Sequence, residues 1–319
     1  MTTPNEAALI APAADDMLDT GAPRLRTPTE ATGTLSPFAT SRMEQSPAQC
    51  DATAGDAPQQ GRLVIVGSGI RALGQMTFEA FGHIKAADEV FYAVADPLGE
   101  AFIERHARRA YDLCMLYDDD KLRIETYAQM TEVMLRSLRQ GRYVVGVFYG
   151  HPGMLVTSSH RAIAIARQEG YRAEMLAGVS AEDNLCADIG FDPSIPGCQT
   201  LEASRLLQSG QPLPTDLHVI LFQVGAVGDH EYNFDRFKNR GFQALIDLLI
   251  NEYGEAHDVY HYVASVYASC RPVIKRHKLA DFRDPDLARE VSVVSTFYLP
   301  PRGTSAPIAE AIARGLSKT

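Results

Sequence analysis

The part of the sequence best suited to ligand chemistry is the segment Val147-Phe-Tyr-Gly-His-Pro-Gly153. It runs from an apolar stretch directly into a loop with two glycines and a proline, and such a loop exposes backbone to a ligand. The imidazole of His151 can act as a general base or a metal ligand, although a loop histidine more often only makes a hydrogen bond. No Cys or acid stands at ligand spacing from His151, so we expect no metal.

A second candidate is the glycine turn Gly67-Ser-Gly69, which follows a short apolar run. Turns of this kind can bring backbone amides to the phosphates of a dinucleotide. The spacing fits poorly, because the third position of that fingerprint is Ala72, the tolerated variant, and Gly74 comes too late. Asp96 lies where a ribose-binding acid would stand, so the turn belongs either to an NAD-dependent dehydrogenase or to the fold alone.

A third candidate lies in the polar segment Tyr117–Tyr127. Arg123 and Tyr127 are four residues apart in a helix-like stretch, so they share one helix face. From spacing alone, such a pair is more often a stabilising stack of a guanidinium on a ring than a functional pair.

Composition and charge exclude several classes of protein. The 319 residues are 45% hydrophobic, enough for one large or two medium cores, and the formal net charge is −10, which disfavours nucleic acid as a partner. The densest basic stretches, 105–109 and 275–278, are typical of solvated helix or loop surface. The five cysteines are scattered and odd in number, which favours a reducing compartment. No apolar run is long enough for a membrane span and no secretion signal opens the chain, so we expect a cytoplasmic protein with no membrane partner.

Alternating strand-like and helix-like segments predict a first α/β lobe. The predicted strands are rich in β-branched and aromatic residues and cover 63–66, 89–96, 143–149 and 171–176. The predicted helices cover 74–87, 97–109, 124–140 and 158–169. This repeated order predicts a largely parallel sheet with helices on both faces.

A second lobe is predicted to begin at Ser180-Ala-Glu-Asp183, where a Ser followed three residues later by an acid is an N-cap signature. Its strongest elements are strands over 218–224, 259–264 and 291–298 and a helix over 242–253. We expect a disordered leader over 1–60, lobes over 61–178 and 179–301, and a tail over 302–319 with a short helical pattern at 307–316.

Several of these motifs together resemble one family of enzymes. They are Val66-Gly-Ser-Gly-Ile70, the Tyr149-Gly-His-Pro-Gly153 loop, Gly178-Val-Ser-Ala-Glu-Asp183 and Phe222-Gln-Val-Gly225. With them the chain resembles the tetrapyrrole-methylase superfamily of S-adenosylmethionine enzymes. The segments 117–127, 192–198 and 294–298 make it similar, more narrowly, to borosin peptide α-N-methyltransferases of the omphalotin type, over residues 61–301.

The resemblance implies a two-lobed class III methyltransferase fold, with a largely parallel first sheet, a mixed second sheet and S-adenosylmethionine held between the lobes. The positions that match the family's cofactor residues are Tyr149, His151, Gly153, Met154, Ser180, Ala181, Gln223, Ala264, Ser295 and Thr296. The glycine turn at Gly67 would then be structural.

The resemblance also implies that Tyr117, Arg123 and Tyr127 match the family's catalytic trio. A backbone amide is a poor nucleophile because its nitrogen lone pair is delocalised into the carbonyl. A guanidinium beside a phenol favours the charged form of that phenol, so a phenolate can take the amide proton. Either tyrosine can fill that role.

The implied reaction is methylation of backbone amides in a ribosomally made precursor peptide. Fused borosins carry this substrate at their own C-terminus beyond a helical clasp, but the residues after Pro301 hold no run of Val, Ile or Leu. We therefore expect a separate precursor peptide, supplied in trans to a homodimer, and methylation of the chain's own leader is less favoured. The same scaffold would also suit a precorrin-type tetrapyrrole C-methyltransferase or a non-catalytic cofactor-binding protein.

Overall fold

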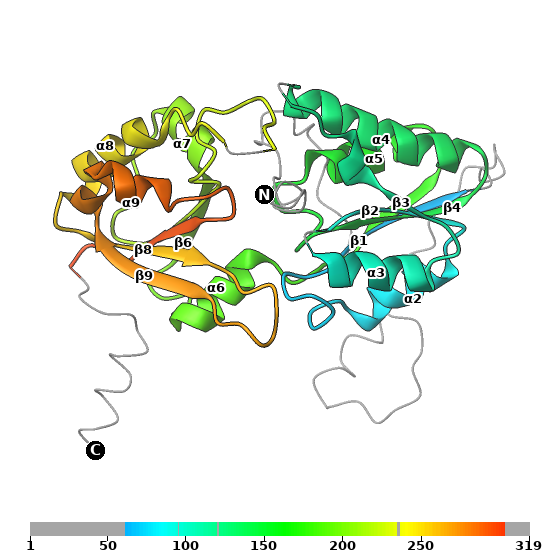
Figure 1. The fold of residues 1–319 in the computed structure, drawn as a ribbon, viewed down its shortest axis with the longest axis horizontal. Coiled ribbons are helices and arrows are strands. Elements are labelled where there is room, and N and C mark those ends of the chain that lie inside the picture. The colour runs from blue at the N-terminus through cyan, green and yellow to red at the C-terminus, as the bar shows by residue number, and fades with distance from the viewer. Residues whose placement is uncertain (1–60, 95, 120, 235–236, 304–319) are drawn as a thin grey trace, which may run out of the picture.

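The computed structural model describes residues 61–94, 96–119, 121–234 and 237–303, which form two α/β lobes side by side (Figure 1). The predicted leader, the predicted helix at 307–316 and most of the tail lie outside the described residues.

The first lobe is built on a five-stranded sheet with strand order β3-β2-β4-β1-β5, in which all neighbours are parallel. Its strands are β1 (Arg62–Gly67), β2 (Glu89–Ala93), β3 (Ala110–Asp112), β4 (Tyr143–Phe148) and β5 (Arg172–Met175). The central strands are buried on both faces, as a parallel sheet covered by helices requires. The prediction of a parallel first sheet is thus confirmed.

Helices cover both faces of this sheet (Figure 1). One apolar cluster places α2 (Phe78–Ala86) and α3 (Pro97–His106) on one face, and a second places α4 (Arg123–Arg139) and α5 (Thr157–Gln168) on the other. Helix α2 starts later than predicted because the Thr77 side chain accepts a hydrogen bond from the Ala80 N–H and so caps the helix there. A short 3-10 helix, η3 (Leu113–Leu116), precedes α4.

The second lobe is built on a mixed sheet with strand order β6-β7-β10-β8-β9, which confirms the predicted class. Strands β6 and β7 are parallel and the other neighbours are antiparallel. Its elements are α6 (Ala181–Ile189), β6 (Cys198–Glu202), α7 (Ala203–Ser209), β7 (His218–Phe222), α8 (Phe242–Tyr253), β8 (Asp258–Val263), β9 (Val273–Lys278), η4 (Leu279–Arg283), α9 (Pro285–Arg289) and β10 (Thr296–Leu299).

Two predictions for the second lobe are wrong. The basic stretch 275–278, expected on a helix or loop, lies in β9 at the edge of the sheet, where its charged side chains stay largely exposed. The strand expected over 291–298 begins only at Thr296, because Ser292–Ser295 form a turn in which the Ser295 N–H donates to the Ser292 carbonyl at 2.9 Å.

Within the described parts of the chain, no helix combines the length and apolarity needed to cross a membrane. In those same parts, no three His, Cys, Asp or Glu side chains gather as they would around a metal ion.

Candidate functional site

The carboxyl ends of β1 and β4 form a tightly packed glycine corner. The Ser68 N–H donates to the Phe148 carbonyl at 2.8 Å, and Gly69 and Gly150 form an antiparallel bridge. A Cβ on Gly67 would lie 2.1 Å from the Gly150 carbonyl oxygen, and a Cβ on Gly178 would lie 2.7 Å from the same atom. The chain itself therefore fills the space over the glycine turn that a pyrophosphate would need.

Asp96 is likewise used by the fold. Its Oδ1 accepts a hydrogen bond from the Gly99 N–H at 2.7 Å and caps α3. Together with the filled glycine corner, this role argues against the dinucleotide interpretation.

The second lobe presents its own sheet edge to this corner. Gln223 follows β7, Ala264 follows β8, and Ser295 precedes Thr296 at the start of β10. Because β10 is antiparallel to both β7 and β8, these four positions lie at the same end of the three strands. We call this end of the sheet the second-lobe edge. The Gln223 backbone has a φ of 58°, so the chain turns sharply as β7 ends.

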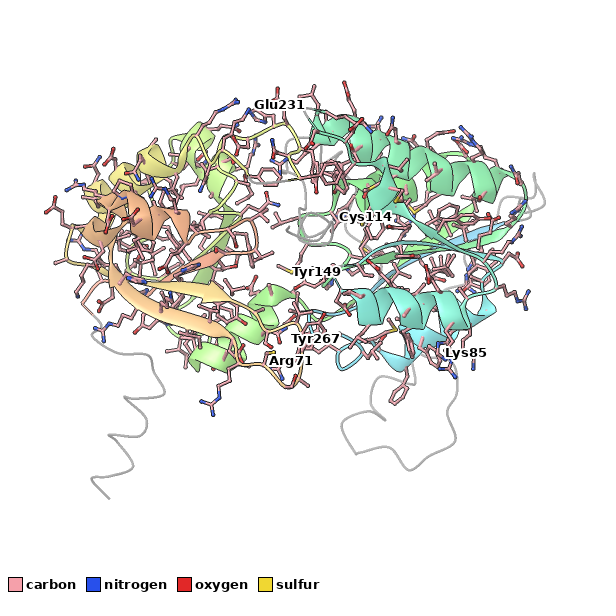
Figure 2. The ribbon with its side chains drawn as sticks, viewed as in Figure 1. Arg71, Lys85, Cys114, Tyr149, Glu231 and Tyr267 are labelled. Carbon is pink, nitrogen blue, oxygen red and sulfur yellow. The ribbon has the colours of Figure 1, made fainter. Side chains whose placement is uncertain are left out.

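The two lobes meet where the predicted cofactor residues lie. Met154 from the β4 loop, Ala181 at the start of α6 and Ala264 all pack against one apolar cluster of the second lobe. Figure 2 shows Tyr149 in the same region, between the lobes. Burial raises the pKa of Tyr149, and the nearby Asp96 carboxylate raises it further, so this phenol is protonated. Residues from both lobes thus meet here, and we use the name cleft for this region between the lobes, bordered by Tyr149, Met154, Ala181 and Ala264.

The side chains of Ser180 and His151 accept hydrogen bonds from nearby backbone N–H groups. The Ser180 hydroxyl accepts from the Asp183 N–H at 3.1 Å and the Ser180 backbone N–H donates to Asp183 Oδ2 at 2.7 Å, which together form the predicted capping box of α6. His151 Nδ1 accepts from the Gly153 N–H at 2.9 Å, and burial lowers the pKa of His151, which keeps the ring neutral. Both residues therefore fix the loop and helix start that border the cleft.

Tyr117, Arg123 and Tyr127 come together in the first lobe. Arg123 is the first residue of α4 and Tyr127 lies one turn later, while Tyr117 follows η3. All three are buried, and the Tyr127 hydroxyl is hydrogen-bonded to both Tyr117 and Arg123. Their cluster also contains Phe148, which precedes the Tyr149 loop, and Val293 of the second lobe packs on it. The predicted trio is thus one group beside the cleft.

A segment of the second lobe, Asp229–Phe234, covers this trio, and we call it the strap. Its backbone pairs with the chain around the start of α4: the Arg123 N–H donates to His230 O at 3.0 Å and the Tyr232 N–H donates to Lys121 O at 2.9 Å. Figure 2 shows Glu231 of the strap, which forms a β-bridge with Leu122. The strap supplies the main-chain partner that the first N–H of α4 lacks within its own helix.

Side chains of the strap complete the packing of the trio. The Tyr232 ring stacks on Tyr117 with centroids 4.4 Å apart, and Arg123 Nη2 donates to the Asp229 carbonyl. Arg123 also lies over the Phe237 ring, 5.7 Å from its centroid. Among the described residues, the buried Nη1 of Arg123 and the hydroxyl of Tyr232 have no hydrogen-bond partner. Tyr232 and Asp229 are not recognisable from the sequence as part of the site, because the strap has no periodic pattern that relates it to α4.

Burial dominates the electrostatics of the trio. It raises the pKa of Tyr127 to about 12, although Arg123 and Tyr117 both lower it, and it raises the pKa of Tyr117 well above the ordinary value. Arg123 thus favours the charged form of Tyr127, as expected, but burial has the larger effect on its pKa. Both phenols are therefore neutral at physiological pH.

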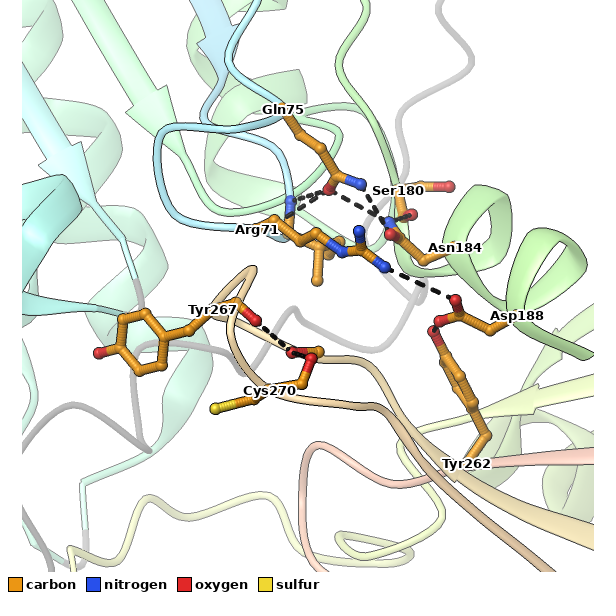
Figure 3. A network of polar contacts seen from close by, with 10 residues as sticks. Arg71, Gln75, Ser180, Asn184, Asp188, Tyr262, Tyr267 and Cys270 are labelled. Carbon is orange, nitrogen blue, oxygen red and sulfur yellow. Dashed lines mark hydrogen bonds and ion pairs between the residues drawn. The ribbon is translucent and has the colours of Figure 1, made fainter.

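A polar network joins the lobes on the other side of the cleft (Figure 3). Arg71 pairs with Asp188 at 3.6 Å, and Asp188 accepts from the Tyr262 hydroxyl at 2.8 Å. Gln75 donates to Asn184 Oδ1 at 2.7 Å, also across the lobes. Since Tyr262 is two residues from Ala264, this network fixes the second-lobe edge relative to the glycine corner.

Comparison with known proteins identifies relatives of this arrangement. Residues 62–262 match the family described as Tetrapyrrole (Corrin/Porphyrin) Methylases. The fold is similar to the crystal structure of uroporphyrin-III-C-methyltransferase from Thermus thermophilus, with a TM-score of 0.53 and 15% identity over 76% of this chain and 92% of that one. It is also similar to a cobalt precorrin-4 methyltransferase, with a TM-score of 0.55 and 17% identity over 77% of this chain and 98% of that one. At these identities the likeness concerns the fold alone.

Much more similar sequences bear the names of peptide-modifying proteins. The chain is 50% identical over 254 residues to the methyltransferase/ribosomally synthesized cyclic peptide omphalotin A precursor of Omphalotus olearius, covering 80% of this chain and 61% of that protein. It is 52% identical over 259 residues to a methyltransferase/type III borosin cyclic peptide precursor of Anomoporia bombycina, covering 81% of this chain and 30% of that protein. The chain thus spans less than two thirds of either relative's length, and the resemblance to omphalotin-type borosins is confirmed.

Proposed function

Because the chain belongs to the family of tetrapyrrole (corrin/porphyrin) methylases, we propose that it is an S-adenosylmethionine-dependent α-N-methyltransferase acting on backbone amides of a ribosomally made precursor peptide. The observation that carries the proposal is the buried, mutually hydrogen-bonded group of Tyr117, Arg123 and Tyr127 beside the cleft between the lobes. Relatives that are about half identical and are named as methyltransferase and cyclic peptide precursors support the choice of a peptide.

The residues around the cleft fit the proposed cofactor. The Tyr149–Met154 loop, the start of α6 and the second-lobe edge offer close backbone together with small or apolar side chains at Gly153, Ala181 and Ala264. Such a cradle suits the flat base and sugar of an adenosyl group. When bound, S-adenosylmethionine would supply an electrophilic methyl group on a sulfonium, whose S–CH3 bond breaks on transfer to leave the thioether S-adenosylhomocysteine.

The trio would make the acceptor nitrogen reactive. The Tyr127 oxygen, as phenolate, takes the proton of the peptide N–H, so that the nitrogen can use its electron pair for the new N–C bond. The guanidinium of Arg123 stabilises the negative charge that develops on the peptide oxygen. Tyr117 donates its hydroxyl hydrogen bond to Tyr127 and so stabilises the phenolate. We assign Tyr127 rather than Tyr117 as the base because the Tyr127 hydroxyl is hydrogen-bonded to both Arg123 and Tyr117, and both contacts favour its phenolate.

The assignment of Tyr127 predicts how the rate depends on pH. With a pKa of about 12, only a small fraction of Tyr127 is phenolate near neutrality, and this fraction grows about tenfold for each pH unit below the pKa. We expect the single-turnover rate at saturating cofactor to rise in that proportion between about pH 7.5 and 9.5. In Tyr127→Phe the residual rate should lack this rise. A plateau of the wild-type rate near neutral pH would assign the proton to another group.

We also propose that the peptide is a separate chain and that the enzyme is a homodimer. Phe78 and Met115 stay 96% and 81% exposed, and large apolar side chains left in water support a further interface. Light scattering tests the dimer. The supply of substrate is tested by where the added mass appears: on an added peptide if it acts in trans, or on this chain if it modifies itself.

The function is tested by incubating the purified chain with S-adenosylmethionine and candidate precursor peptides with apolar tails. Tandem mass spectrometry should locate each added methyl on a backbone nitrogen. A precorrin-type substrate in a parallel reaction tests the tetrapyrrole alternative that the family name raises. Cofactor binding without turnover of any peptide or tetrapyrrole would instead favour a non-catalytic role.

A further inference from the structure

His261 is a buried histidine that neither the sequence motifs nor the trio explains. It lies on β8 opposite Phe297 of β10, is 3% exposed, and meets the edge of the Phe297 ring with centroids 6.0 Å apart. Burial, together with smaller effects of the nearby His277 and Lys275, lowers the pKa of His261 to about 4. The ring is therefore neutral in a mostly apolar layer.

One polar contact of His261 reaches the cleft. Its Nε2 is 2.7 Å from the hydroxyl oxygen of Ser295, while its Nδ1 has no hydrogen-bond partner among the described residues. Burying a polar ring with one nitrogen that makes no hydrogen bond costs stability. Among the described residues, the contact to Ser295 is the only side-chain hydrogen bond of His261, so it is the one contact through which the ring can act.

Ser295 links His261 to the turn that precedes β10 at the second-lobe edge. Its hydroxyl oxygen accepts from the Ser292 N–H at 3.0 Å, which closes the Ser292–Ser295 turn from inside. That turn lies directly on the end of β7, because a Cβ on Gly225 would come within 2.0 Å of the Ser292 carbonyl oxygen. The position of the turn therefore sets the positions of Gln223, Ser295 and Thr296 relative to one another.

We propose that His261 is a positioning residue for the cofactor: its Nε2 holds the Ser295 hydroxyl, and through the Ser292–Ser295 turn it fixes the second-lobe edge against which the cofactor binds. This inference rests on the proposed function for the place of the cofactor. The placement of the turn stands on the hydrogen bonds alone.

The test compares two substitutions of nearly equal length. His261→Gln keeps a polar atom near the position of Nε2, whereas His261→Met removes it. We expect His261→Met to weaken binding of S-adenosylhomocysteine, measured by calorimetry, about tenfold, and His261→Gln to stay within about threefold of wild type. In turnover, His261→Met should raise the KM for S-adenosylmethionine and leave kcat nearly unchanged, because the trio is untouched.

The matched control is His218, a second buried histidine on β7, which β10 separates from β8 in the same sheet. It contacts the Tyr298 hydroxyl at 2.8 Å and the Ile195 carbonyl at 3.0 Å, at the opposite end of the sheet from the cleft. His218→Met should cost stability without changing the affinity for S-adenosylhomocysteine. Unchanged affinity in His261→Met, or an equal loss in His218→Met, would reduce His261 to a core residue.

Amide hydrogen exchange separates this inference from the proposed function. The Ser292 N–H should lose protection in His261→Met and keep it in His218→Met, whether or not a cofactor binds. Wild-type protein that fails to bind S-adenosylhomocysteine would refute the proposed function and, with it, the cofactor role of His261. Undiminished protection of Ser292 in His261→Met would refute the positioning itself.

Discussion

Arg123→Ala should lower the rate of methyl transfer about a thousandfold, because preorganised stabilisation of a developing oxyanion contributes on that order. Arg123 joins the Tyr127 hydroxyl to the Asp229 carbonyl of the strap, and its buried Nη1 is a donor without a partner among the described residues. Arg123→Lys should recover only a small part of the loss, since an ammonium cannot make these contacts at once. The measurement is a single-turnover rate on a peptide, followed by mass spectrometry.

Two controls keep this result interpretable. Affinity for S-adenosylhomocysteine should stay within about twofold of wild type, because the substitution removes charge stabilisation and leaves the residues proposed to hold the cofactor unchanged. Arg136→Ala, on the exposed part of the same helix, should leave rate and affinity unchanged. Turnover in Arg123→Ala within tenfold of wild type would mean that Arg123 serves stability alone.

Gly67→Ala should be among the most destabilising single substitutions in the chain. The new methyl would lie 2.1 Å from the Gly150 carbonyl oxygen, 3.0 Å from Pro152 Cδ and 3.2 Å from the Gly178 Cα. Two of these contacts are to backbone, which cannot move aside as a flexible side chain does, so we expect a loss of about 3 kcal/mol or more in the free energy of unfolding. Urea denaturation followed by circular dichroism measures it.

Gly82→Ala is the matched control for Gly67→Ala. Gly82 lies inside α2, and a Cβ there would meet nothing within 4 Å. Alanine should therefore raise the stability by about 0.5 to 1 kcal/mol through its higher helix propensity. If Gly67→Ala proves as harmless as Gly82→Ala, the close packing of the glycine corner is not a constraint on this fold.

The first lobe was largely predictable because its elements carry strong local signals. Strands β1 and β4 are continuous apolar runs, and α4 repeats apolar residues at helical spacing, so each is recognisable without its neighbours. Strands β3 and β9 were missed for the opposite reason. The first has only three residues, and the second is an edge strand with mostly exposed, charged side chains and no alternating pattern.

The candidate site was predictable only where it coincides with motifs. The β4 loop and the capping box at Ser180 are local patterns, so both are recognisable in the sequence. The strap and His261 act through contacts between segments far apart in the chain: Tyr232 meets Tyr117, and His261 meets Ser295. No spacing rule encodes such contacts. The sequence could not predict how far burial raises the pKa values of the phenols, because this depends on how completely the folded chain covers them.

The strap also gives the chain an order of events during synthesis. The phenols and guanidinium are translated long before Asp229–Phe234, and until that segment emerges from the ribosome the first turn of α4 has one main-chain donor unmet and Tyr117 has no ring against it. A nascent first half therefore carries the three polar side chains without the second-lobe segment that encloses them. The enclosed arrangement of these side chains forms only after the second half has been made and has docked on the first.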